Sequence, residues 1–183
     1  YLELVQKFNV RSENPRLLQM ALAESDNNLG KTAATLLLRQ QGAELIRKVL
    51  YSGEEEKVYP LLAVLRGIGS KESLGMLEKM AFDTDLPLAT RKEATAAIGG
   101  SYGGEERILE LLRAEQLPEN LIPSAVTGVS RAWRKSVRTE AASYLDSSSD
   151  EENALPPMKE LLAMEGSVEK GLVVFKNNCA LCH

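Results

Sequence analysis

Hydrophobic and polar residues follow one another along residues 1–146 with the period of amphipathic helices. Apolar positions recur every three or four residues within runs of about 10 to 13 residues. Short breaks rich in Gly, Pro, Asn or Asp separate these runs, and no run alternates with period two for long enough to predict a strand. We therefore predict an all-α fold. The predicted helices span residues 2–10, 14–25, 30–40, 43–52, 55–68, 71–82, 87–99, 104–115, 118–130 and 132–145.

The apolar pattern repeats under a fixed shift of 31 residues. A constant period of this size is typical of repeat arrays, in which each helical hairpin buries its apolar face against the next hairpin. The remaining helices match almost as well when a slip of one residue is allowed. The sets that coincide are Ile46, Leu77 and Ile108; Val49, Met80 and Leu111; and Ala43 with Leu74.

Residues 89–112, ATRKEATAAIGGSYGGEERILELL, resemble a HEAT-type repeat, in particular the short variety also found in phycobilin-lyase-like proteins. The resemblance covers most of residues 28–146, and the tetratricopeptide and ankyrin patterns are missing there. It implies a HEAT-like α-solenoid of stacked helical hairpins over residues 1–146. Such an array commonly acts as a scaffold or docking surface for another protein.

The two Cys residues and the single His of the chain all lie in the terminal CALCH. This is the spacing of c-type haem attachment, in which two thiols bond to the haem vinyl groups and the following imidazole binds the iron. Cys179 and Cys182 lie one helical turn apart and project from the same side. The candidate cofactor-binding residues are Cys179, Cys182 and His183, with His183 as the metal ligand. A redox CxxC or a zinc site explains the motif less well, since no strand precedes it and zinc requires four ligands.

Upstream of this motif, Gly171 and Phe175 complete a longer pattern of glycine, three residues, an aromatic residue, three residues and CxxCH. This segment resembles the first helix of class I cytochrome c. The resemblance implies a covalent haem c, electron transfer, and a bacterial protein of the periplasm or the exterior. It also implies a redox partner protein or an attached dehydrogenase-type domain. The distal ligand and closing helix of that family would follow His183, and whether this piece alone holds haem is left open.

Between these regions, residues 146–157, DSSSDEENALPP, interrupt the helical pattern with a Ser-rich and acidic run that ends in two prolines. We therefore place the solenoid at residues 1–146, a linker at 147–157, and the truncated start of a cytochrome c-type domain at 158–183. The chain begins at Tyr1 without a signal peptide, so we expect a piece of a longer protein.

The charge and the composition of the chain exclude some classes of function. The chain has 183 residues with 22 Lys and Arg against 26 Asp and Glu, a net charge of −4. This acidic balance disfavours a nucleic-acid partner. The longest apolar stretches fall far short of the roughly 18 residues of a membrane span. Pairing of two copies of the chain is left open, because exposed apolar side chains at the end of a solenoid could associate.

Three further motifs receive structural interpretations. Residues 30–32, Gly-Lys-Thr, resemble the end of a phosphate-binding loop, but position 25 is Ser and no strand precedes it, so we expect a helix start. The glycines of residues 99–104 predict a turn. A basic stripe on the last solenoid helix predicts a solvated face or a docking surface for an acidic partner or for haem propionates. The stripe consists of Arg131, Arg134, Lys135 and Arg138.

These observations favour electron transfer through covalently bound haem, with the HEAT-like segment as scaffold or docking surface. The alternative is a protein interaction scaffold without a haem function. A HEAT-like nucleic-acid or lyase enzyme is disfavoured by the acidic balance. The chain offers no catalytic cluster, so whether the protein is an enzyme is left open, and we expect any dehydrogenase chemistry in a separate domain.

Overall fold

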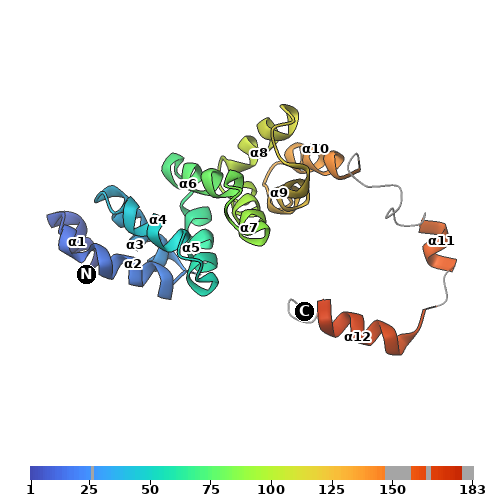
Figure 1. Ribbon diagram of the computed structural model, residues 1–183, viewed down its shortest axis with the longest axis horizontal. Helices are drawn as coiled ribbons and strands as arrows, with labels where there is room; N and C mark the ends of the chain where they lie inside the picture. Colours follow the sequence, from blue (N-terminus) through green and yellow to red (C-terminus); the bar gives the residue numbers. More distant parts are fainter. Residues whose placement is uncertain (26, 147–157, 164–165, 179–183) are drawn as a thin grey trace. The chain divides into compact units, whose positions relative to one another are not determined.

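The computed structural model describes residues 1–25, 27–146, 158–163 and 166–178. These residues form α-helices, short 3-10 turns and connections, and the described part of the chain contains no strand (Figure 1). The all-α prediction is thereby confirmed. The chain divides into two compact units, Tyr1–Ser148 and Ser149–His183.

The helices of the first unit follow the predicted ones closely. They are α1 (Leu2–Phe8), η1 (Arg11–Glu13), α2 (Asn14–Ala23), α3 (Asn28–Arg39), α4 (Ala43–Leu50), α5 (Glu55–Ile68), α6 (Lys71–Phe82), α7 (Leu88–Gly99), α8 (Gly104–Arg113), η2 (Glu119–Leu121), α9 (Ile122–Val129) and α10 (Lys135–Asp146). The second unit contains α11 (Met158–Ala163) and α12 (Val168–Asn178).

The main difference lies in residues 118–130, which were predicted as one helix. A 3-10 turn, η2, comes first, and α9 begins only at Ile122, with Pro123 in its first turn. Proline has no N–H to donate and fits the first turn of a helix but not its interior. Pro123 therefore sets the start of α9.

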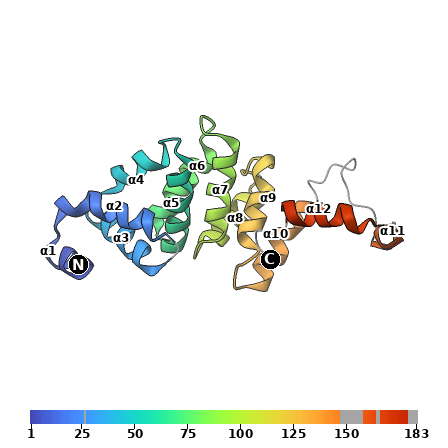
Figure 2. The same ribbon diagram turned by 90° about the horizontal axis from the view of Figure 1, so that it is seen from below.

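Helices of the first unit pack in two rows. Helices α3, α5, α7 and α9, the first-helix row, each contact the next member of the row. Helices α4, α6, α8 and α10, the second-helix row, lie between or beside them, and α5 to α9 succeed one another along the unit in chain order (Figure 2). The core runs between the two rows.

The residues that coincide under the shift of 31 occupy equivalent places in this core. Ile46 in α4, Leu77 in α6 and Ile108 in α8 are all fully buried. Met80 and Leu111, from the second coinciding set, are also buried. The apolar period of the sequence thus corresponds to a position that is fully buried in each of α4, α6 and α8.

Glycines allow α7 and α9 to approach at the level of their backbones. A Cβ atom added to Gly128 of α9 would lie 2.4 Å from the carbonyl oxygen of Ala96 in α7. A Cβ atom on Gly99 would lie 2.9 Å from the carbonyl oxygen of Ala125. Both distances are shorter than nonbonded carbon and oxygen atoms tolerate, so this contact requires residues without side chains.

Replacing a core residue tests the stacked core. Leu77→Ala should lower the free energy of unfolding by about 2 to 5 kcal/mol, because it removes a fully buried side chain and leaves a cavity. The measurement is urea unfolding followed by circular dichroism. Leu4→Ala, at a side chain that is 61% exposed, is the matched control and should change stability little. Equal effects at the two positions would contradict the packing described.

Two glycine substitutions with opposite expected effects on stability test the contact between α7 and α9. Gly128→Ala should destabilise the protein by about 1 to 3 kcal/mol, because the new methyl group overlaps the α7 backbone. Gly75→Ala, within α6, should stabilise it by about 0.5 to 1 kcal/mol, because no atom lies within 4 Å of its added Cβ. Thermal unfolding of both variants measures the difference. A stabilising Gly128→Ala would show that α7 and α9 do not touch at this point.

Candidate functional site

The terminal CALCH segment follows helix α12. Cys179, Cys182 and His183 lie outside the described residues, so the structure describes only the segment that precedes them. Helix α12 spans Val168–Asn178, and the Ser167 hydroxyl accepts a hydrogen bond of 3.3 Å from the backbone N–H of Lys170. This cap fixes the start of the helix.

Gly171 and Phe175 lie one turn apart in α12 and therefore share a face. The Phe175 side chain is 46% exposed, and a Cβ atom on Gly171 would meet no atom within 4 Å. Among the described residues this face of α12 is accessible. A glycine followed by an aromatic residue one turn later leaves room for a closely crossing helix.

No alternative metal centre appears in the part of the chain that the structure describes. Within it, no three His, Cys, Asp or Glu side chains converge closely enough to hold a metal ion. None of the described helices combines the length and the apolar composition that crossing a bilayer demands.

The Gly-Lys-Thr segment of residues 30–32 opens helix α3, as predicted. The Asn27 side chain caps this helix, because its Oδ1 atom accepts hydrogen bonds from the N–H groups of Leu29 at 2.8 Å and Gly30 at 3.2 Å. These are the groups that a phosphate would need. Asn27 therefore occupies the donors of this helix start.

The glycine-rich residues 99–104 form the turn between α7 and α8. Gly103 has a φ of +76°, a left-handed conformation that favours glycine, and the Ser101 hydroxyl donates to the carbonyl of Ala97 at 2.6 Å. Tyr102 projects from this turn and is 89% exposed.

The basic stripe is divided among several local contacts. Arg134 forms an ion pair with Glu106, and the Arg138 guanidinium donates hydrogen bonds to the carbonyls of Ala132 and Trp133. Arg131 instead lines a hollow on the first-helix row. Arg131 and Arg134 precede α10, which begins at Lys135, so the four cations do not all lie on one helix, contrary to the prediction.

A larger basic feature follows the first-helix row. Hollows of about 390, 290, 440 and 190 Å³ succeed one another there, and each shares lining residues with the next. We call this surface the basic groove, defined by Lys31, Arg66, Gly67, Gly100 and Arg131. Arg39 also lines it, and Glu105 is the one acidic residue among the described residues that line these four hollows.

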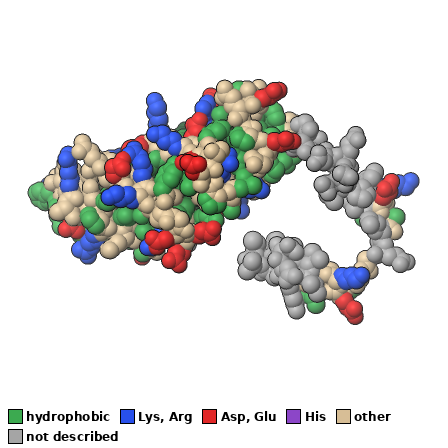
Figure 3. All heavy atoms as spheres, in the orientation of Figure 1, with side chains coloured by type: hydrophobic (Ala, Val, Ile, Leu, Met, Phe, Trp, Pro, Cys, Tyr) green, Lys and Arg blue, Asp and Glu red, His purple; other side chains and the backbone are tan. Residues whose placement is uncertain are grey.

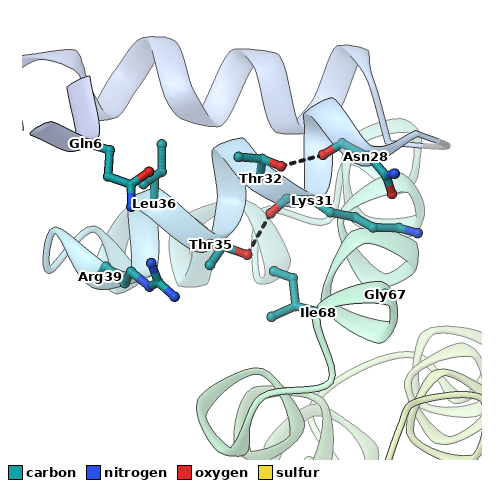
Figure 4. Close-up of a pocket in the computed structure, with 9 residues that line it drawn as sticks. All are labelled: Gln6, Asn28, Lys31, Thr32, Thr35, Leu36, Arg39, Gly67 and Ile68. Atoms are coloured by element: carbon teal, nitrogen blue, oxygen red, sulfur yellow. Dashed lines mark hydrogen bonds between the residues drawn. The ribbon is translucent and has the colours of Figure 1, made fainter. Parts of the chain in front are cut away.

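Two of the cations cross from one helix of the row to the next. The Lys31 side chain extends from α3 toward Gly67 of α5 (Figure 4), where an added Cβ atom would lie 2.5 Å from Lys31 Cε. Arg66 at the end of α5 lies over Gly100 in the same way, with Cδ 3.0 Å from an added Cβ atom. The missing side chains of Gly67 and Gly100 provide the space for these aliphatic stems.

Two cations of the second-helix row form ion pairs with carboxylates of neighbouring helices. Arg107 of α8 contacts Glu78 of α6 at 2.6 Å, and Arg113 of α8 contacts Glu140 of α10 at 2.6 Å. Hydrogen bonds to Glu78 and then Glu110 raise the pKa of the Arg107 guanidinium, and those from Arg113 lower the pKa of the Glu140 carboxyl.

Acidic and basic side chains lie among one another on the face drawn in Figure 3. The cations of the groove lack such partners within the described part of the chain. No described residue forms an ion pair or a hydrogen bond with the side chain of Lys31, Arg66 or Arg131.

The groove was not predicted from the sequence. Lys31 was interpreted only as part of a phosphate-loop pattern, and Arg66 was not singled out. The available signal is that Lys31 precedes Gly67 by 36 residues and Arg66 precedes Gly100 by 34 residues, separations slightly longer than the repeat of 31.

Comparison of the chain with protein-family models, with curated proteins and with solved structures finds no match.

The ion pair between Arg113 and Glu140 predicts a pH dependence of stability. Because the pKa of folded Glu140 is lowered, its contribution is present above the unfolded pKa of about 4.3 and is lost as the pH falls through the folded value. Thermal unfolding should show wild type more stable than Glu140→Gln at neutral pH, with the difference shrinking in acid. In an Arg113→Gln background this pH dependence should vanish. A difference that is constant with pH would rule the pair out as its source.

Proposed function

We propose that this protein transfers electrons through a c-type haem bound covalently at Cys179, Cys182 and His183. The observation that carries the proposal is the placement of helix α12, which ends at Asn178 directly before the CALCH motif and bears Gly171 and Phe175 on an accessible face. Two thiols and an imidazole are the donor set that covalent haem requires. We place the protein in the periplasm or outside the cell.

In this proposal each residue has a defined part. The sulfur atoms of Cys179 and Cys182 hold the porphyrin, and His183 binds the iron through one ring nitrogen. Its other ring nitrogen needs a hydrogen-bond acceptor, which fixes the tautomer. When bound, the haem supplies a reversible one-electron couple between ferrous and ferric iron. A redox partner protein or an attached dehydrogenase-type domain exchanges electrons with it.

We further propose that residues 1–146 form a HEAT-like α-solenoid that serves as scaffold or docking surface. Three features support this assignment. Successive members of the first-helix row contact each other. Equivalent positions of the second-helix row are fully buried. Ion pairs also join α6 to α8 and α8 to α10.

The haem proposal is tested by expressing the full-length protein, with an export signal, in cells that contain the haem c maturation proteins. Purified wild type should show the pyridine haemochrome band of covalent haem c and stain for haem on a denaturing gel. The Cys179→Ser/Cys182→Ser variant should lose covalent haem. Phe175→Ala, which leaves both thiols in place, should keep the attachment. A colourless wild-type protein would refute the proposal.

A protein interaction scaffold that needs no haem is the second candidate function. The unpaired cations of the basic groove favour it, since such a surface attracts an acidic partner. Partner capture that persists in the Cys179→Ser/Cys182→Ser variant would support this role.

A further inference from the structure

The basic groove combines a row of unpartnered cations with hydrogen-bond acceptors along its walls. We propose that it binds an extended acidic segment of a partner protein, with a carboxylate at about every third residue. The inference rests on the first unit alone and does not depend on haem.

The charges that line the groove favour an acidic ligand. The protein as a whole is acidic, with a net charge of −4, and Arg107 and Arg113 of its second-helix row are paired with carboxylates of neighbouring helices. Along the groove, Lys31, Arg66 and Arg131 have no such partner among the described residues, and Glu105 alone brings a carboxylate to the lining. Cations gathered in a hollow with low-dielectric walls focus a positive potential there. A carboxylate-bearing ligand supplies the charges that the groove lacks.

The hydroxyl groups in the groove favour a peptide over a nucleic acid as its ligand. The hydroxyls of Thr32, Thr35, Thr127 and Ser130 line the hollows, and each donates its proton to a backbone carbonyl, at 2.7, 2.7, 2.8 and 2.7 Å. Each hydroxyl therefore offers only its lone pairs to a ligand. Lone pairs accept the N–H groups of an extended peptide, whereas they repel the phosphate oxygens of a nucleic-acid backbone.

The spacing of the helices sets the spacing of the ligand charges. Packed helices lie about 8 to 10 Å apart, and an extended chain rises about 3.3 Å per residue. Three residues of an extended segment therefore span one step of the first-helix row. Lys31 on α3 and Arg66 on α5 are one step apart, and Arg66 reaches over Gly100 toward the next hollow.

Two aromatic side chains flank the end of the groove at Arg131. Tyr102 is 89% exposed and Trp133 is 95% exposed, and both line the hollow that Arg131 also lines. Exposed aromatic rings beside a cation offer an anchor for an apolar residue of the bound segment. Trp133 is the single Trp of the chain, so its fluorescence reports on this end of the groove.

The test uses a fluorescein-labelled peptide of about twelve residues with Glu at every third position, long enough to span the row. Anisotropy should show binding that weakens with salt, and a peptide with Gln in place of Glu should not bind. Arg66→Gln should weaken binding by about threefold to tenfold, and the triple variant Lys31→Gln/Arg66→Gln/Arg131→Gln should abolish it. Lys48→Gln, an exposed cation of α4 outside the groove, should leave the affinity unchanged.

Circular dichroism and thermal unfolding of each variant separate a binding defect from a folding defect. In the Cys179→Ser/Cys182→Ser background, the acidic peptide should also shift the emission of Trp133, which keeps the result independent of haem. Equal peptide binding by wild type and a folded triple variant would overturn the proposal. So would tighter binding of single-stranded DNA of about twelve nucleotides, since the groove would then be a nucleic-acid site.

Discussion

Burial of one apolar face of each helix against its neighbours is the constraint on which the first unit depends. A fully buried Leu or Ile contributes about 1.5 to 3 kcal/mol relative to an exposed one, whereas an exposed ion pair contributes about 0 to 1 kcal/mol. Ile46, Leu77 and Ile108 therefore decide that the helices stack. The ion pairs between Glu78 and Arg107 and between Glu140 and Arg113 help to determine which helices pack together. They contribute only a small part of the stability.

The groove follows from the same stacking. Where α7 and α9 meet at Gly99 and Gly128, the backbones themselves approach closely, and each of the two glycines lines a hollow of the groove. Gly67 and Gly100 likewise leave room beside the helices that carry them. Lys31 and Arg66 lay their aliphatic stems in that space and keep their charged ends accessible, as long basic side chains commonly do. The close packing of the helices thus leaves a depression in the surface, and the basic side chains of Lys31 and Arg66 line it.

Periodicity in the sequence was sufficient for the helices, because each apolar face repeats with the helical period. It failed at residues 118–130, where the local geometry that Pro123 imposes outweighs the apolar pattern. The surface was harder to predict. Arg134 and Arg138 share a helical spacing, yet contacts with Glu106 and with backbone carbonyls decide their roles. Lys31 and Arg66 are brought to one groove only by stacking, which a local pattern does not contain. The residues predicted to hold haem, Cys179, Cys182 and His183, lie outside the described residues, and that prediction rests on the sequence and on α12.

In each of two places along the first-helix row, a cation of one helix lies over a glycine at or beyond the next helix of the row. Duplicating one helix pair in the gene would lengthen the groove by about 10 Å. If the groove binds an extended acidic segment as proposed, the lengthened protein would accommodate about three more residues of that segment, so the number of helix pairs would set the length of segment that fits.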